Sequence, residues 1–193
     1  MSPRGRATPD VRGLLFDAAE RVVLRSGPAG LTSRAVTTEA GCAKGLLHAH
    51  FGGLDEFVAE LCLDRIDGVA ARASALADRA GQGEVAENLH TALDVLLGST
   101  GPALAAAAMT RAGSARRVRE AMASGDRGFA VIQDALARYL AAELRLGRVP
   151  AGTDPQAAAL ALVGTAHHLL MTAPPGEPAA AGGLWAVVAL ILG

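Results

Sequence analysis

Residues 31–51 decide the fold, and they read LTSRAVTTEAGCAKGLLHAHF. Thr32 is placed to cap a short helix that continues to about residue 40, and Gly41 ends it. A second short helix is predicted over 43–50. Two short helices joined at a glycine turn are typical of a helix-turn-helix motif, whose second helix lies in the major groove of DNA. Many helical bundles also join short helices through glycine, so the pattern alone leaves a purely structural role open.

Longer helices are predicted on both sides of this stretch. From Asp10, a good N-cap, apolar residues recur at helical spacing until Ser26, and residues 27–30 form a turn. These apolar positions are Val11, Leu14, Leu15, Ala18, Ala19, Val22 and Val23. A long helix begins at Leu54 and continues toward Leu76. Its apolar stripe consists of Phe57, Val58, Leu61, Cys62, Ile66 and Val69.

The remainder of the chain divides at glycine and proline residues into further helical segments. They are expected at about 84–98, 102–112, 115–124, 126–147, 154–172 and 180–192. We find no convincing strand and no internal repeat. The sequence therefore predicts an all-α fold of about nine to ten helices, in which three N-terminal helices precede a bundle of longer ones.

The composition favours a folded protein with reduced thiols. Of the 193 residues, 51% are hydrophobic and 19% are charged, which excludes disorder over most of the length. No apolar run reaches the roughly 20 residues of a membrane helix, and no signal peptide is recognised at the N-terminus. Cys42 and Cys62 form neither a disulfide framework nor a zinc site. We therefore expect a cytoplasmic protein with both cysteines reduced.

Basic residues gather at the beginning of the chain. Residues 1–50 carry seven basic and four acidic side chains, whereas the rest of the chain carries eleven basic and fifteen acidic ones. This distribution indicates an end that binds a polyanion, although an excess of three charges can also arise by chance. Residues 1–9 are predicted to form a basic arm, in which Arg4 and Arg6, together with Arg12, favour DNA binding.

The helix-turn-helix stretch resembles the signature of the tetracycline-repressor (TetR) family of bacterial transcription regulators. The matching positions are Thr32, Ala40, Gly41, Lys44, Gly45, Leu47, His50 and Phe51. The acidic pair Asp55 and Glu56 opens the next helix as it does in family members. The resemblance covers about residues 10–62, and the remainder of the chain is similar in length and in helical character.

The resemblance implies two domains, an N-terminal helix-turn-helix DNA-binding domain over 1–53 and a C-terminal ligand-binding and dimerisation domain over 54–193. It further implies a one-component repressor that binds a palindromic operator in double-stranded DNA and is released by a small-molecule effector. The apolar segments 157–171 and 184–192 independently favour a homodimer, because a helix that is apolar all round must be buried. Burial in the core of a single subunit is the alternative.

Side-chain chemistry assigns roles within the motif. Phosphate contacts are expected from hydroxyl, guanidinium, ammonium and imidazole groups, namely those of Thr32, Ser33, Arg34, Lys44 and His48. Gly45 lets the helix approach DNA closely, and Leu46 and Ala49 are suited to thymine methyl groups. His50 either contacts phosphate or packs under Phe51.

Several positions depart from the family pattern. Ala43 stands where a serine or threonine commonly caps the recognition helix, and Leu46 stands where a small polar residue is common. His48 replaces a common tyrosine that reaches phosphate, and Leu54 replaces a common lysine. Each change removes a contact or a cap. The departures favour, as the alternative function, a TetR-like module that acts through protein–protein contacts with weak or no DNA binding.

Candidate effector contacts are spread over the later helices. They are His90, Met109, Phe129, Tyr139, His167 and Met171, with Met122, His168 and Trp185 as further candidates. Each of these side chains is more often found in plain core or interface packing than in contact with a ligand. Few aromatic residues and many alanines favour an apolar cavity, and hence an apolar or amphipathic effector. The arginines within 111–119 are suited to an anionic ligand or to a solvated helix face.

We find no catalytic constellation in the sequence. The adjacent His167 and His168 point to different faces of a helix, because neighbours lie about 100° apart, so they are poorly placed to chelate one metal ion. A nucleophile elbow, a phosphate-binding loop and a metal-binding repeat are also missing from the sequence. We therefore expect no enzyme activity, no cofactor, no metal ion and no membrane association.

Overall fold

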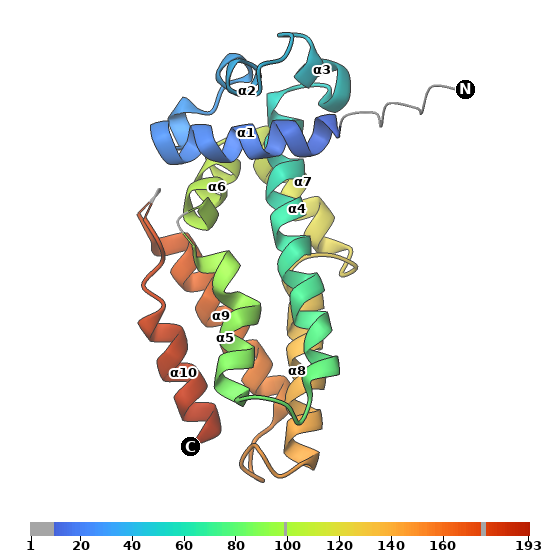
Figure 1. The fold of residues 1–193 in the computed structure, drawn as a ribbon, viewed down its shortest axis with the longest axis vertical. Helices are drawn as coiled ribbons and strands as arrows, with labels where there is room; N and C mark the ends of the chain where they lie inside the picture. The colour runs from blue at the N-terminus through green and yellow to red at the C-terminus, as the bar shows by residue number, and fades with distance from the viewer. Residues whose placement is uncertain (1–9, 99, 175–176) are drawn as a thin grey trace, which may run out of the picture.

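The computed structural model describes residues 10–98, 100–174 and 177–193 (Figure 1). Over these ranges the chain forms ten α-helices, two short 3-10 helices and no strand, which confirms the all-α prediction. The α-helices are α1 (Val11–Ser26), α2 (Ser33–Glu39), α3 (Leu46–Phe51), α4 (Leu54–Ala75), α5 (Val85–Leu97), α6 (Thr100–Met109), α7 (Ala112–Ala123), α8 (Phe129–Arg145), α9 (Pro155–Thr172) and α10 (Gly182–Leu192). The 3-10 helices are η1 (Pro28–Gly30) and η2 (Leu76–Arg79). The expected arm over 1–9, with Arg4 and Arg6, lies outside the described residues.

The caps predicted from the sequence start α1 and α2. The carboxylate of Asp10 and the hydroxyl of Thr32 each accept a hydrogen bond from the backbone N–H three residues later, at 3.0 and 3.1 Å. Each bond satisfies one of the free N–H groups in a first helical turn. One side chain of the predicted α1 stripe is misplaced, because Leu14 is 41% exposed, whereas Phe16, which was not included, is buried.

The third helix is shorter than predicted. α3 begins at Leu46 rather than near residue 43, so Lys44 and Gly45 lie in the turn before it. The N–H of Leu46 donates to the carbonyl of Ala43 at 3.0 Å, which closes this turn. Because the N-cap residue Gly45 has no side chain, the first turn of α3 has no side-chain cap. The prediction that the lysine and the glycine belong to the recognition helix was therefore wrong.

α4 is the longest helix of the described chain, and it connects the two ends of the molecule. In Figure 1 it descends from the end formed by α1, α2 and α3 to the opposite end of the bundle. It packs against α5, α6, α7 and α8, while α9 packs on α8 and α10 packs on α9. With 22 residues at 1.5 Å per residue, α4 is about 33 Å long. One helix thus connects the helix-turn-helix end with the far end of the bundle.

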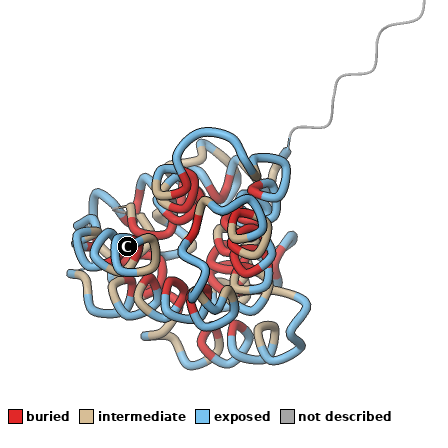
Figure 2. Tube along the Cα trace, turned by 90° about the horizontal axis from the view of Figure 1, so that it is seen from below, coloured by how far each residue is buried: buried red, intermediate tan, exposed pale blue. Residues whose placement is uncertain are grey.

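Buried residues, red in Figure 2, lie on the faces of the helices that point into the bundle. An aromatic cluster joins the N-terminal helices to α4. The ring centroids of Phe16 and Phe51 lie 5.7 Å apart, those of Phe16 and Phe57 lie 5.6 Å apart, and Phe51 meets Phe57 edge to face at 5.0 Å. Aromatic pairs at these distances contribute stability beyond the area that they bury. The cluster packs α3 directly on the first turn of α4.

A polar network closes the end of the bundle opposite α3. The fully buried carboxylate of Glu143 accepts a hydrogen bond at 3.1 Å from the first N–H of the loop 81–83, and it pairs with Arg148 at 3.3 Å. Arg148 also donates to the backbone carbonyl of Gly83. Asn88 donates to the backbone carbonyl of Gln82 at 2.8 Å. The loop that follows α4 is therefore fixed to α8 by side chains.

Tyr139 belongs to the same network and provides a pH-dependent reporter. Its hydroxyl accepts a hydrogen bond from Asn88 at 2.9 Å, and burial, assisted by the nearby Glu143, raises the pKa of Tyr139 to about 12. In an unfolded chain the pKa of tyrosine is about 10. The folded state therefore holds this proton more tightly, so the resulting stabilisation is fully present below pH 10 and is lost as the pH rises toward 12.

Tyr139 is the single tyrosine of the chain, so its ionisation can be followed without interference from another phenol. We expect tyrosinate absorbance at 295 nm to appear near pH 12 in the folded protein, and near pH 10 in 6 M guanidinium chloride. Circular dichroism measured in parallel shows which samples remain folded. Titration near pH 10 with full helical signal would contradict the buried environment described here.

Candidate nucleic-acid interface

The predicted DNA contacts gather at one end of the molecule. α2 and α3 form the top of the fold in Figure 1, and they are joined by the turn over 40–45. The nine residues lie at the start of α2, in this turn or on α3, and they are Thr32, Ser33, Arg34, Lys44, Gly45, Leu46, His48, Ala49 and His50. The structure thus brings residues from two elements to one surface.

Exposure is high at most of these positions. Seven are exposed, namely Thr32, Arg34, Lys44, Gly45, His48, Ala49 and His50. Ser33 and Leu46 are half-buried, while Leu47, Val36 and Phe51 are buried beneath the surface. The exposure of His50 favours a phosphate contact over packing under Phe51.

The local charges leave two basic groups available to a polyanion. Glu39 accepts hydrogen bonds from Arg21 at 2.8 Å and from Arg25 at 2.9 Å, which lower the pKa of Glu39 and tie α1 to the last turn of α2. Within the described chain, neither Arg34 nor Lys44 has an acidic partner within 4.0 Å. Their charges therefore face solvent beside the other exposed groups of α2, the 40–45 turn and α3.

Arg12 does not extend this surface. Its guanidinium pairs with Glu60 of α4 at 3.0 Å and lies 4.8 Å from the ring centroid of Phe16. The side chain therefore joins α1 to α4. The prediction that Arg12 supplements the DNA contacts of the arm receives no support from this placement.

Contacts that the sequence did not reveal connect the helix-turn-helix end to α7. Arg111 donates to the backbone carbonyl of Leu31 at 2.8 Å, and the hydroxyl of Ser114 donates to the carbonyl of Asp55 at 2.8 Å. Both acceptors are backbone atoms, so residue type gives no signal for these pairs. Of the arginines within 111–119, the first thus serves a contact between the two parts of the fold.

The six main candidates for effector contacts do not converge on one site. Their interactions are pairwise: His90 stacks on Trp185 with ring centroids 4.0 Å apart, and Phe129 meets His167 edge to face at 5.1 Å. Met171 is exposed. Another part of the fold contains a cavity of about 410 Å³, and it is lined by none of these candidates.

That cavity lies between α1, α4, α5, α6 and α9. Its lining is mainly aliphatic, and Asp17, Glu20 and Arg65 lie among the residues that surround it. The thiol of Cys62 also lines it, and burial raises the pKa of this thiol to about 11, so the group is neutral at neutral pH. The cavity thus combines an apolar interior with a charged edge.

The described residues contain neither a group of side chains suited to a metal ion nor a helix suited to a membrane. Across 10–98, 100–174 and 177–193, no three His, Cys, Asp or Glu side chains are grouped so that they could hold a metal ion. Over the same part of the chain, no helix combines the length and the hydropathy needed to cross a bilayer.

Comparisons with known proteins agree with this geometry. The sequence model of the family described as bacterial regulatory proteins, tetR family, matches residues 15–61. A solved transcriptional regulator from Rhodococcus sp. Rha1 is 25% identical, with a TM-score of 0.64 over 94% of this chain and 96% of that chain. The multidrug binding protein EbrR, complexed with malachite green, is 25% identical, with a TM-score of 0.57 over 96% of this chain and 99% of that chain.

A more distant structure shares the fold alone. FadR from Bacillus subtilis, in complex with stearoyl-CoA, is 14% identical, with a TM-score of 0.61 over 93% of this chain and 97% of that chain. No curated protein matches the sequence. The family model matches the end that carries the exposed basic surface, and the fold is shared with solved transcriptional regulators over nearly the whole chain, so residues 15–61 of this chain form a helix-turn-helix domain of the tetR family of bacterial regulatory proteins.

Proposed function

We propose that this regulator, which is not an enzyme, is a homodimeric repressor released from a palindromic operator by a small-molecule effector. The proposal is carried by the exposed surface of α2, the 40–45 turn and α3, where Arg34 and Lys44 present charge without a nearby acidic partner in the described chain. Phosphate contacts from this surface would fix the protein on the duplex, and Leu46 and Ala49 would reach base edges.

We assign DNA reading to residues 1–53, and effector binding and dimerisation to residues 54–193. Because the proposed target is DNA, we also place the protein in the cytoplasm.

Exposed apolar side chains on α9 and α10 support the homodimer. Leu160 and Met171 of α9 are 58% and 46% exposed, and Trp185 and Leu190 of α10 are 37% and 83% exposed. A single subunit therefore leaves these large side chains in water, although burial of each would contribute about 1.5 to 3 kcal/mol. A two-fold interface would bury them twice and would set two recognition helices at a fixed spacing on the operator.

The double variant Leu160→Asp, Leu190→Asp is expected to be monomeric at concentrations at which the wild-type chain is dimeric. Each charge would have to be desolvated in a symmetric interface, and each would occur twice. Sedimentation velocity measures the outcome. The matched control is Leu24→Asp, a similarly exposed leucine on α1 at 47%, which should leave the dimer intact. A dimeric double variant, or a monomeric wild-type chain at micromolar concentration, would exclude this interface.

The effector part of the proposal rests on the cavity and on two structural neighbours. A cavity of about 410 Å³ is within the size range of small-molecule sites. EbrR was solved with malachite green and FadR with stearoyl-CoA, so two proteins of this fold hold small molecules. In the present protein, an effector that prefers one orientation of α4 would shift the population of the two recognition helices and release the DNA.

Fluorescence anisotropy tests the proposal directly. The purified protein is titrated into the DNA that flanks its own gene and into scrambled DNA, over a series of salt concentrations. Tight, sequence-selective binding that weakens steeply with salt is expected, because each neutralised phosphate releases counterions. A small molecule that lowers the affinity for the operator would then establish effector control. A ligand that binds without changing DNA affinity would refute this mechanism for that ligand.

One observation favours a second candidate, a helical module that acts through protein–protein contacts. The first turn of α3 has no side-chain cap, and Leu46 presents an apolar, half-buried side chain there. Lack of DNA binding at low salt would support this candidate. In that case the Arg34→Ala, Lys44→Ala variant should retain its function in the cell, whereas a repressor should lose it.

A further inference from the structure

The cavity next to α1 contains two distinct environments. Its interior is formed by aliphatic side chains from four helices, among them Val69 of α4, Leu96 of α5, Leu104 of α6 and Leu170 of α9. Each of these leucines and the valine is at most 6% exposed. Asp17 and Glu20 of α1 complete the lining with carboxylates. A molecule in this cavity would thus touch both the bundle and the first helix of the DNA-binding end.

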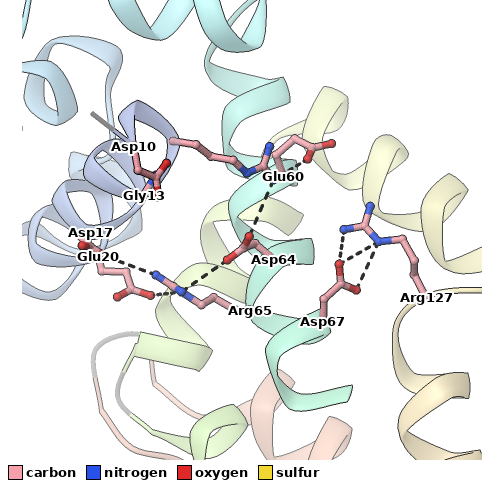
Figure 3. Close-up of polar contacts among 10 residues, drawn as sticks. Asp10, Gly13, Asp17, Glu20, Glu60, Asp64, Arg65, Asp67 and Arg127 are labelled. Atoms are coloured by element: carbon pink, nitrogen blue, oxygen red, sulfur yellow. Dashed lines mark hydrogen bonds and ion pairs between the residues drawn. The ribbon is translucent and has the colours of Figure 1, made fainter. Parts of the chain in front are cut away.

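At the edge of the cavity next to α1, acidic side chains outnumber basic ones. Three carboxylates surround the single guanidinium of Arg65, which lies 2.5 Å from Glu20, 3.7 Å from Asp17 and 3.5 Å from Asp64 (Figure 3). The neighbouring Arg12 pairs with Glu60 of α4 at 3.0 Å and also lies 3.9 Å from Asp64, so four carboxylates share two arginines. The cavity edge therefore carries more negative than positive charge.

Asp17 is the carboxylate most available to a ligand. Its side chain is 67% exposed, and its 3.7 Å distance from the guanidinium is too long for a direct hydrogen bond. Glu20, by contrast, is 25% exposed and holds Arg65 through a short hydrogen bond. A cationic head placed beside Asp17 would gain a partner at small cost, whereas an anionic head would meet two lining carboxylates and one arginine that is already paired.

We propose that this cavity binds an amphipathic organic cation, whose apolar body lies among the aliphatic side chains and whose positive head lies beside Asp17 and Glu20. The inference deepens the proposed function, on which its regulatory part rests. Arg65 and Glu20 form a direct link between α4 and α1. A cation that shares these carboxylates weakens that link, and its apolar body wedges α1 away from α6. Binding there therefore changes the orientation of the DNA-binding end.

Two ions of nearly equal shape and opposite charge test the ligand class. Tetraphenylphosphonium and tetraphenylborate are titrated into the full-length protein by calorimetry. We expect the phosphonium to bind about tenfold more tightly than the borate, because two partly exposed carboxylates attract the cation and repel the anion. Equal affinities, tighter borate binding or no phosphonium binding would overturn the proposal.

Variants test the location of the site. Asp17→Asn combined with Glu20→Gln should reduce the preference for the phosphonium at least about tenfold, because Arg65 then loses two of its acidic partners. Asp94→Asn, an exposed position on α5 that does not line the cavity, is the matched control and should leave the preference unchanged. An unchanged preference in the double variant would overturn the charge assignment.

Ala105→Leu tests the apolar part by filling the cavity from α6. It should lower the affinity for both ions at least about tenfold. Ala71→Leu, on the exposed face of α4, should leave both affinities unchanged. If circular dichroism shows that the leucine variant does not fold, Ala105→Val adds less volume at the same position and should weaken both ions less strongly. Wild-type affinity in a folded cavity variant would overturn the location.

DNA binding separates this inference from the proposed function. Phosphonium binding with the expected variant effects, but with unchanged operator affinity, would support the site and contradict effector release through it. If another compound releases the operator equally from the wild-type chain and from Ala105→Leu, the proposed function stands and the cavity is not the effector site.

Discussion

Replacing both Arg34 and Lys44 by alanine is expected to weaken operator binding by about a thousandfold at low salt. Both side chains are exposed at the helix-turn-helix surface and have no acidic partner within 4.0 Å in the described part of the chain. In a homodimer the double variant removes four charged groups, and a loss of about 1 kcal/mol for each gives this factor. The dependence of log affinity on log salt should also become shallower by roughly 3 to 4 units, at about 0.9 per phosphate contact.

A matched variant removes the same amount of charge elsewhere. Arg119 of α7 and Arg138 of α8 are exposed on the bundle, so Arg119→Ala with Arg138→Ala should change the affinity little and leave the salt dependence unchanged. Fluorescence anisotropy with one operator fragment compares both variants with the wild-type protein. Equal effects of the two double variants would mean that overall charge, rather than the surface of α2 and α3, controls binding.

Glu143→Ala should lower the free energy of unfolding by about 3 kcal/mol. The carboxylate is fully buried, accepts the N–H of Gly81 and pairs with Arg148. Its removal leaves the N–H of Gly81 without its acceptor and Arg148 without its counter-charge, and breaking a buried ion pair on one side is strongly destabilising. For a chain of this length the melting temperature should fall by roughly 10 °C, measured at constant protein concentration.

Two further variants distinguish burial from the mere loss of a glutamate. Glu143→Gln keeps an acceptor for the loop and loses the charge opposite Arg148, so its cost should be intermediate. Glu120→Ala breaks a pair with Arg116 at 3.1 Å in which both side chains are more than 60% exposed, and it should cost less than about 0.5 kcal/mol. Similar melting temperatures for Glu143→Ala and Glu120→Ala would show that the network does not hold the loop.

Local sequence signals predict the starts of α1 and α2 correctly, but they misplace the start of α3. Asp10 and Thr32 start their helices because each side chain bonds a nearby N–H, an interaction that depends only on sequence neighbours. α3 begins three residues later than expected because Ala43 has no side-chain acceptor to start a helix, and the chain first forms a turn that ends at Leu46. That turn places Lys44 outside the helix.

The exposed surface could be predicted, but the cavity could not. Polar residues of a short amphipathic motif face solvent once its apolar residues are buried, so the motif alone indicated the exposed side chains. The cavity depends on the packing of five helices that are distant in sequence, and it is lined mainly by aliphatic residues that no chemical type distinguishes from core. Candidates chosen for aromatic or sulfur-containing side chains, such as Phe129 and Met171, therefore lie elsewhere.

α4 behaves mechanically as a beam held at both ends. Its first turn is fixed by Phe57 in the aromatic cluster, and the loop beyond its last turn is gripped by Glu143. The cavity lies against its middle, from Cys62 to Val69. A beam whose ends stay in place but can pivot bows when it is loaded at mid-span, so its ends change slope. A ligand would then rotate α3 rather than translate it, and the bending stiffness of α4 would set how much of the binding energy reaches the DNA.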